Sequence, residues 1–346
     1  MDLAMRLLVA PLLFLFGCTT ALPRAWKRNI QLKQWITSTL FRYALDNLKP
    51  RHIQALSPTT LETYTDWVKA MQLQQEPRDF PLEALEVRVE PLEVEPAASI
   101  LWVGNPCRAT KFVLSFHGGG YVAPLSKGHL NWCWNAYIRE QEKGSTDGHP
   151  DDHEVAVAIL QYSLAPEAQY PTQLRQAVSA LDHILGKGIA PGDLIIGGDS
   201  AGGNLVVQLL HHLCHSMSGP QPLSDQSLRF AGIFLVSPWK YVLGDIKEAE
   251  RLRAHPALPL DGDITWLGSI KHVTKSVYIT CGHEEVFMDN VLAFSEAVRR
   301  MNPGLEVKLR VGPHEVHDSM LLEGIDGVIG DATKEMQAWA ASRLQC

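Results

Sequence analysis

The sequence predicts an α/β fold in which a mostly parallel sheet is covered by helices on both faces. Short apolar runs that fit strands alternate with longer amphipathic stretches from residue 112 to the C-terminus. Phe112–Phe116 and Val155–Leu160 look like buried strands, and Pro171–Leu185 carries apolar residues at helical spacing. Such alternation is typical of parallel sheets. The 346 residues, 46% of them hydrophobic, supply one large core or two modest ones.

The elements are expected in the following order. A helix at Trp26–Leu48 precedes another that runs from Pro58 to about Gln75, with Ser57 as its N-cap. Strands are then expected at Leu85–Val89, Ile100–Val103, Phe112–Phe116, Val155–Leu160, Leu194–Ile196, Ile233–Val236, Val277–Thr280 and Val307–Val311. Helices are expected between and after them at Pro171–Leu185, Ala201–Met217, Met288–Met301 and Ala332–Leu344. Ligand sites in such sheets lie at the carboxyl ends of strands, so residues that follow the strands are the candidates for chemistry.

An apolar segment, residues 7–22, lies near the start of the chain. The charge that follows it is more positive than the charge before it, which favours an uncleaved anchor with the body of the protein on the cytoplasmic side, for example at the endoplasmic reticulum. The segment is shorter than the roughly 20 residues of a spanning helix. It also fits a signal-peptide core with a cleavage site at residues 19–21, which would give a secreted protein. A buried N-terminal helix is the third alternative.

Composition excludes several classes of protein. The net charge is −7 and there is no long basic run, so no nucleic-acid partner is expected. The six cysteines form no CxxC pair, which argues against a zinc ribbon or a thioredoxin-like site. His211 and His215 share one helix face, but no carboxylate accompanies them as in HExxH, so no metal is expected.

Residues 198–203 read GDSAGG, between a short apolar strand and an amphipathic helix. A serine at such a strand-to-helix turn is a candidate nucleophile, here Ser200. Gly198 and Gly202 leave room for the tight turn, and the N-terminus of the helix favours developing negative charge. The alternative, a glycine-rich turn without chemistry, is disfavoured by the strand, the helix and the additional Gly203.

Residues 117–121 read HGGGY and directly follow the expected strand Phe112–Phe116. Acyl transfer needs N–H donors directed at the oxyanion of the tetrahedral intermediate. Gly118 and Gly119 are the expected donors, together with the N–H of Ala201. The alternative is a glycine turn that only connects a strand to a helix.

Three motifs in this order, HGGGY, YSLAPE at residues 162–167 and GDSAGG, resemble the hormone-sensitive-lipase family of α/β-hydrolases. This family includes arylacetamide-deacetylase-like and steryl-acetyl-hydrolase-like esterases. Taken alone, YSLAPE indicates only a strand end and a turn. The resemblance implies an α/β-hydrolase fold without a cofactor. It also implies a helical cap over residues 25–80 and the catalytic domain over 81–346, while the apolar run near the start predicts a hydrophobic anchor or signal segment over residues 1–24.

The remaining members of a catalytic triad must follow in the chain order Ser, acid, His. After the expected strand Val277–Thr280, the spacing of the resembled family points to Glu285 as the acid, with Glu284 in reserve. A pair of solvated glutamates is the other interpretation. After the last strand, His317 is the expected base and His314 its competitor. Glutamate is adequate because the acid only orients the imidazole and stabilises its charged form.

These residues predict a serine hydrolase that cleaves carboxylic esters. The family resemblance implies small apolar esters with short-to-medium acyl groups, in lipid, sterol or secondary metabolism. One rival uses the same machinery for transfer, cyclisation or condensation. The other is a non-catalytic ligand receptor on this scaffold, which the presence of His317 disfavours. The segment after Trp239 is shorter than in the resembled family, so the shape of the cap stays open. The cap aromatics are expected either to suit a bulky apolar group or to pack the cap onto the sheet; they are Trp26, Trp35, Phe41, Tyr64 and Trp67.

Overall fold

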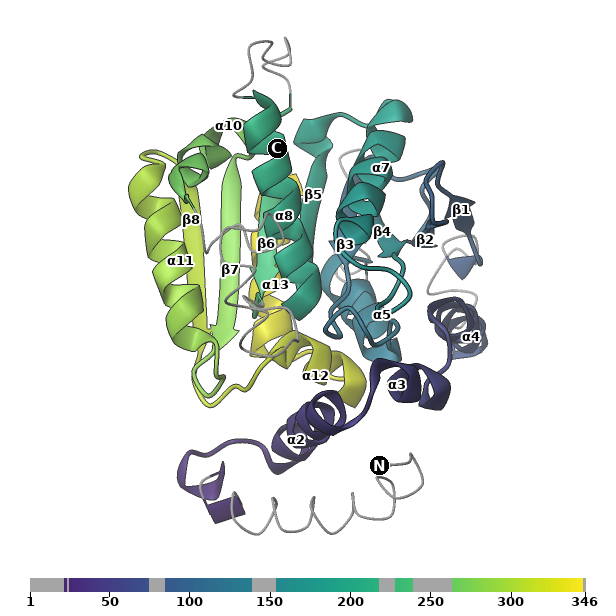
Figure 1. Ribbon diagram of the computed structural model, residues 1–346, viewed down its shortest axis with the longest axis vertical. Coiled ribbons are helices and arrows are strands. Elements are labelled where there is room, and N and C mark those ends of the chain that lie inside the picture. The colour runs from purple at the N-terminus through teal and green to yellow at the C-terminus, as the bar shows by residue number, and fades with distance from the viewer. Residues whose placement is uncertain are drawn as a thin grey trace, which may run out of the picture.

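The computed structural model describes residues 22–23, 25–74, 85–138, 154–217, 228–238 and 263–344. Within them, an 8-stranded sheet runs in the order β1-β2-β4-β3-β5-β6-β7-β8 (Figure 1). The pairs β1–β2 and β2–β4 are antiparallel, and every other pair is parallel. The expected α/β fold is therefore confirmed. The strands are β1 (Val89–Pro91), β2 (Ser99–Val103), β3 (Lys111–Phe116), β4 (Val155–Gln161), β5 (Leu194–Asp199), β6 (Gly232–Val236), β7 (Ser276–Gly282) and β8 (Glu306–Gly312).

Helices cover both faces of this sheet. α7, α8 and α11 lie over one face, and α5 and α13 lie behind the other (Figure 1). The helices are α2 (Leu32–Asn47), α3 (Pro50–Leu56), α4 (Thr60–Gln74), α5 (Lys127–Cys133), α7 (Thr172–Gly186), α8 (Ser200–Met217), α10 (Ile270–Val273), α11 (Met288–Met301), α12 (Ser319–Asp326) and α13 (Asp331–Leu344). Shorter turns are η2 (Trp134–Ile138, a π-helix), η4 (Pro191–Asp193) and η5 (Thr265–Ser269).

Two hydrophobic cores follow from the alternation of side chains along each strand. In β3, Phe112, Leu114 and Phe116 pack into the core under α7, α8 and α11, while Val113 packs into the core on the other side. All four side chains are buried, and each stabilises the fold by about 1.5–3 kcal/mol relative to exposure. Burial on both faces explains why the strands are continuous apolar runs.

The helices that precede the sheet take two different positions. α2 and α3 lie beyond the carboxyl ends of the strands, where α2 adjoins α12 (Figure 1). An ion pair of 2.7 Å between Lys33 Nζ and Asp326 Oδ1 connects α2 to α12. α4 instead packs on the edge of the sheet, where Tyr64 donates a 2.6 Å hydrogen bond to the carbonyl of Trp102 in β2. α2 and α3 are therefore in a position to cover the strand ends.

Local hydrogen bonding moves several expected boundaries. The helix expected from Trp26 begins as α2 at Leu32, because Asn29 takes the left-handed conformation (φ +54°) and closes a turn. Ser57 caps the end of α3 rather than the start of the next helix. Thr59 and Glu62 form reciprocal hydrogen bonds that start α4 at Thr60 instead.

The expected strand Leu85–Val89 is also displaced, because β1 spans Val89–Pro91 and Leu85 is buried against α4. Of the apolar segment 7–22, only Leu22 lies within the described residues, and residues 239–262 of the segment that starts at Trp239 lie outside them. Among the described helices, none has the length and apolar character needed to cross a membrane.

Candidate active site

Ser200 lies at the sharp turn from β5 into α8. Its φ of +48° is left-handed, a conformation that costs a non-glycine residue about 1–2 kcal/mol. The neighbouring glycines make this turn sterically feasible. A Cβ at Gly198 would lie 2.5 Å from the carbonyl oxygen of Phe116, and a Cβ at Gly202 would overlap the same carbonyl. The turn therefore holds Ser200 at the carboxyl end of β5, where α8 begins.

His317 and Glu285 converge on this serine from two separate loops. Nε2 of His317 lies 2.9 Å from Ser200 Oγ. Nδ1 of the same ring lies 3.3 Å from Oε2 of Glu285. Glu285 follows β7 and His317 follows β8, so parallel neighbouring strands bring the two loops together. The structure thus brings together the three residues that the sequence singled out.

The competing residues point elsewhere. Glu284 pairs with Arg28 and also lies 3.2 Å from Nδ1 of His283. His314, at a φ of +60°, places its Nδ1 2.5 Å from the carbonyl oxygen of Arg28. Both side chains therefore contact the N-terminal segment rather than Ser200.

Ser237 is a site residue that the sequence analysis missed. It follows β6 at a φ of +43°, and its Oγ donates a 2.6 Å hydrogen bond to Oε2 of Glu285. The same Oγ accepts a 3.1 Å hydrogen bond from the N–H of Asp318. One buried hydroxyl therefore connects the acid loop to the histidine loop. Its position directly after a strand end is shared with other polar residues, so the sequence gives no specific signal for it.

The glycine loop after β3 differs from expectation at Gly118. The N–H of Gly118 donates a 3.0 Å hydrogen bond to Oδ2 of Asp199, which leaves no proton for an oxyanion. Gly119 (φ +98°) and Gly120 (φ +62°) line the cavity next to Ser200 instead. Within the described part of the chain, their N–H groups find no acceptor. Gly119 therefore matches its expected position, whereas the pairing with Asp199 contradicts Gly118 as a donor.

Ala201, the third expected donor, is buried in the first turn of α8. N–H groups in the first turn of a helix have no partner within the helix. Its N–H is thus free of intrahelical bonding, directly beside the nucleophilic position.

The YSLAPE segment has a structural role that the residues alone did not reveal. Tyr162 stacks on the ring of His117 with centroids 4.3 Å apart, and its hydroxyl donates a 2.7 Å hydrogen bond to the His117 carbonyl. The N–H of Ala165 donates to the carbonyl of Tyr121 at 2.8 Å. Burial, and then the neighbouring His129, lower the pKa of His117 to about 4, so this ring is neutral. The segment thereby packs beneath the glycine loop and fixes its course.

A cavity of about 990 Å³ opens at Ser200. Trp35 and Phe41 of α2 line it, so these two cap aromatics lie where a bulky apolar group would contact them. The other three cap aromatics do not line it: Tyr64 and Trp67 are buried against the sheet, and Trp26 is 85% exposed. Tyr64 and Trp67 therefore follow the second alternative, in which cap aromatics pack onto the sheet, whereas Trp26 follows neither alternative.

His211 and His215 are one helical turn apart in α8. Their rings lie 4.0 Å apart, and Nδ1 of His215 lies 2.9 Å from the carbonyl oxygen of His211. Across the described ranges, no three His, Cys, Asp or Glu side chains gather as a metal site.

Comparison with known proteins agrees with the fold. The family described as alpha/beta hydrolase fold matches residues 113–321. An acetyl-hydrolase of Streptomyces hygroscopicus is 28% identical over 243 residues, which cover 62% of this chain and 70% of that protein. The hormone-sensitive lipase of Ictidomys tridecemlineatus is 35% identical over 104 residues, which cover 28% of this chain and 12% of that protein.

Solved structures share the fold. A thermostable esterase from Pseudomonas putida superposes with a TM-score of 0.57 at 18% identity, covering 87% of this chain and 92% of the esterase. The family match covers more than half of the chain, and the relatives agree with it. The chain therefore belongs to the hormone-sensitive-lipase family of α/β-hydrolases.

Proposed function

We propose that this protein is a carboxylic ester hydrolase in which Ser200, His317 and Glu285 form the catalytic triad. The single observation that carries the proposal is the distance of 2.9 Å between His317 Nε2 and Ser200 Oγ at the strained turn after β5. The names of similar proteins, an acetyl-hydrolase and an esterase, support this class of reaction.

The chemistry follows from the positions of the atoms. Ser200 Oγ attacks the ester carbonyl while its proton passes to Nε2 of His317. Glu285, on the Nδ1 side of the ring, stabilises the resulting imidazolium. His317 then gives the proton to the departing alcohol, which leaves an acyl group on Ser200. Water that loses a proton to the same histidine releases the carboxylic acid and restores the serine.

The N–H groups of Gly119, Gly120 and Ala201 are the proposed donors to the oxyanion. Gly119 and Gly120 line the cavity beside Ser200 without another acceptor, and Ala201 follows the nucleophile directly. Removing one such donor typically costs about 100- to 1000-fold in turnover. Gly120 is proposed as a donor in place of the expected Gly118, because Asp199 already accepts the N–H of Gly118.

The substrate is proposed to be a neutral apolar ester with a short or medium acyl group. The relative named an acetyl-hydrolase supports a small acyl group. Trp35 and Phe41 in the cavity wall support a bulky apolar or aromatic substituent. Aromatic side chains bury a large contact area and therefore favour such groups.

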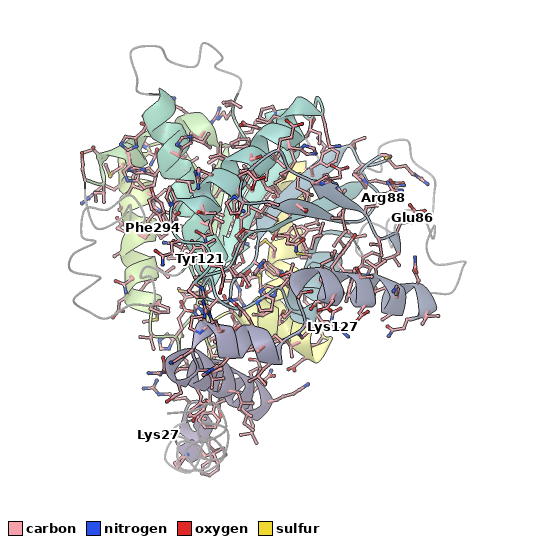
Figure 2. The ribbon with its side chains drawn as sticks, turned by 45° about the vertical axis from the view of Figure 1, so that its right-hand side comes forward. Lys27, Glu86, Arg88, Tyr121, Lys127 and Phe294 are labelled. Carbon is pink, nitrogen blue, oxygen red and sulfur yellow. The ribbon has the colours of Figure 1, made fainter. Side chains whose placement is uncertain are left out.

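Association with a membrane through residues 7–22 remains part of the proposal. It rests on the apolar sequence of that segment and on exposed apolar side chains that follow it, Trp26 (85% exposed) and Leu32 (54%). Lys27, the residue after Trp26, lies at the lower end of the molecule in Figure 2, away from the sheet. Lysine and arginine near an apolar segment favour contact with anionic lipids.

A fluorophosphonate probe tests the catalytic assignment directly. The purified wild-type protein should hydrolyse p-nitrophenyl butyrate and should be labelled at Ser200. Ser200→Ala should lose both hydrolysis and labelling while it keeps its far-ultraviolet circular dichroism spectrum. Labelling at a different serine, or hydrolysis that persists in the variant, would contradict the proposal.

A further inference from the structure

Asp318 approaches His317 from the side opposite to Glu285. Its Oδ2 lies 3.4 Å from Nε2 of the imidazole, while Oε2 of Glu285 lies 3.3 Å from Nδ1. The ring therefore lies between two carboxyl groups, one at each nitrogen. The triad accounts for Glu285 but gives Asp318 no role.

The backbone holds Asp318 in this position at a conformational cost. Its φ of +57° and ψ of +47° are left-handed, a conformation that favours glycine. Its N–H donates to Ser237 Oγ at 3.1 Å, the hydroxyl that also holds Glu285. The side chain is buried, and its Oδ1 has no hydrogen-bond partner within the described residues. A buried carboxyl oxygen without a partner costs free energy, so its retention next to the reacting nitrogen calls for a function.

We propose that Asp318 is a positioning residue that stabilises the charged form of His317 at Nε2 and thereby makes the hydrolase work at alkaline pH. This inference rests on the proposed catalytic function of Ser200 and His317. Because Nε2 must be unprotonated to accept the proton of Ser200, a carboxylate that holds a proton on Nε2 suppresses activity at neutral pH.

The charged groups around the ring favour the protonated form of His317. Besides Asp318, negative charge faces His317 from Glu285 in the loop after β7 and from Asp199 at the end of β5, whereas Ser200 and the ring of Phe287 are neutral. Burial opposes the charge of the imidazolium, but Asp318 and then Glu285 outweigh it and raise the pKa of His317 to about 9. Burial raises the pKa of Asp318 well above its usual range and the charge of His317 opposes that rise, so this buried pair holds one proton between its two members.

Asp318→Asn is the decisive variant. Asparagine has nearly the same shape and tolerates the left-handed conformation, but it carries no charge. The wild type should show a rise of kcat/KM with pH that has its midpoint near pH 9, as the pKa of His317 requires. The variant should move this midpoint down by about one to three pH units, the usual effect of losing a charge at this distance. The fraction of the alkaline plateau retained at pH 7 should rise by at least about tenfold. A residue with a merely structural role would lower the plateau without moving the midpoint.

The matched control is Asp289→Asn, which removes the same charge from an exposed residue in the first turn of α11. This change should leave the midpoint where it is. The rate of Ser200 labelling by the uncharged inhibitor diisopropyl fluorophosphate, measured against pH, provides a second readout that does not require turnover. It should follow the same midpoints.

The outcomes separate the two proposals. If the inhibitor does not modify Ser200 at any pH, the proposed function itself fails. If Ser200 is modified but Asp318→Asn keeps the wild-type midpoint, or Asp289→Asn shifts it equally, then the role of Asp318 is wrong while the hydrolase assignment stands. If Asp318→Asn does not fold, Asp318→Ser, which is also small and uncharged, must give the same downward shift.

Discussion

The Oγ of Ser237 donates a 2.6 Å hydrogen bond to Oε2 of Glu285, the oxygen that also faces His317 at 3.3 Å. The contact joins residues 48 positions apart, at the ends of the adjacent parallel strands β6 and β7. A carboxylate can hold an imidazole in one orientation only if its own position is fixed. Ser237 supplies that fixation from outside the triad.

We expect Ser237→Ala to lower kcat by about tenfold to a hundredfold, because a hydrogen bond to a charged group contributes about 1.5–3 kcal/mol. Serine and alanine both carry a Cβ, so the left-handed backbone costs the two residues similarly. Ser319→Ala is the control, since its hydroxyl donates only to the carbonyl of Val316 in the histidine loop. Steady-state kinetics on p-nitrophenyl butyrate measure both variants. Equal losses in the two would show that loop stability, rather than the position of Glu285, is responsible.

Glu285→Gln and His317→Ala should each reduce kcat by at least about a thousandfold, because triad members act as a unit. Glu284→Gln and His314→Ala are the neighbouring controls and should lose less than about tenfold, since both side chains contact Arg28 rather than Ser200. The measurement is kcat at the alkaline plateau of each variant. A larger loss in His314→Ala than in His317→Ala would reverse the assignment of the base.

Asp199→Asn should loosen the glycine loop, because Asp199 Oδ2 accepts the N–H of Gly118 at 3.0 Å and lies 3.2 Å from Nε2 of His129. Losing charge-assisted bonding at a buried carboxylate should lower the free energy of unfolding by about 1–3 kcal/mol. It should also lower kcat more than it changes KM, because the neighbouring donors act mainly in the transition state. Urea unfolding and kinetics test this, with the exposed Asp182→Asn as the control. An unchanged kcat would mean that the loop holds its shape without Asp199.

The sequence was sufficient for the parallel core of the fold. Strands such as β3 and β5 are buried on both faces, so they appear as short apolar runs whatever their surroundings. Boundaries in the N-terminal helices were predicted less well. The start of α4 depends on a reciprocal bond between Thr59 and Glu62, which competes with an equally plausible cap at Ser57. The helix α12 was not expected, because its short apolar run follows the histidine loop directly.

Only those site residues that lie within sequence motifs could be predicted. Ser200 and the alternatives at the acid and base positions stand within recognisable segments. The choice of glycine donors was not predictable from the motif, because the N–H of Gly118 is occupied by Asp199, 81 positions further along the chain. Ser237 and Asp318 were missed for the same reason: their roles come from contacts across loops, and no local pattern distinguishes them from other polar residues.

Residues 7–22 should bring the protein to membranes. The full-length chain should pellet with the membrane fraction, whereas a chain that starts at Ala25 should stay in the supernatant with its esterase activity retained. The physical reason is the apolar character of the segment together with the basic residues that follow it. Ultracentrifugation, immunoblotting and N-terminal sequencing distinguish the outcomes. An intact chain in the supernatant would argue against an anchor, and a mature N-terminus near Leu22 would support secretion.

Finally, we expect p-nitrophenyl esters from acetate to octanoate to be cleaved with higher kcat/KM than the palmitate. Each buried methylene contributes about 0.8 kcal/mol, but only where an apolar wall receives it. Trp35 and Phe41 provide such a wall. However, the ion pairs Arg28–Glu284 and Arg42–Asp46 also line the cavity, and a long chain in contact with them gains nothing from burial.

Trp35→Ala should therefore reduce kcat/KM for octanoate several-fold and leave acetate nearly unchanged, because an acetyl group is too short to reach far from Ser200. Trp26→Ala is the matched control, since Trp26 is 85% exposed and does not line the cavity. The series is measured below and above the concentration at which each ester forms micelles. A kcat/KM that keeps rising through palmitate, or that increases sharply once micelles form, would identify a true lipase and contradict the preference for short and medium acyl groups.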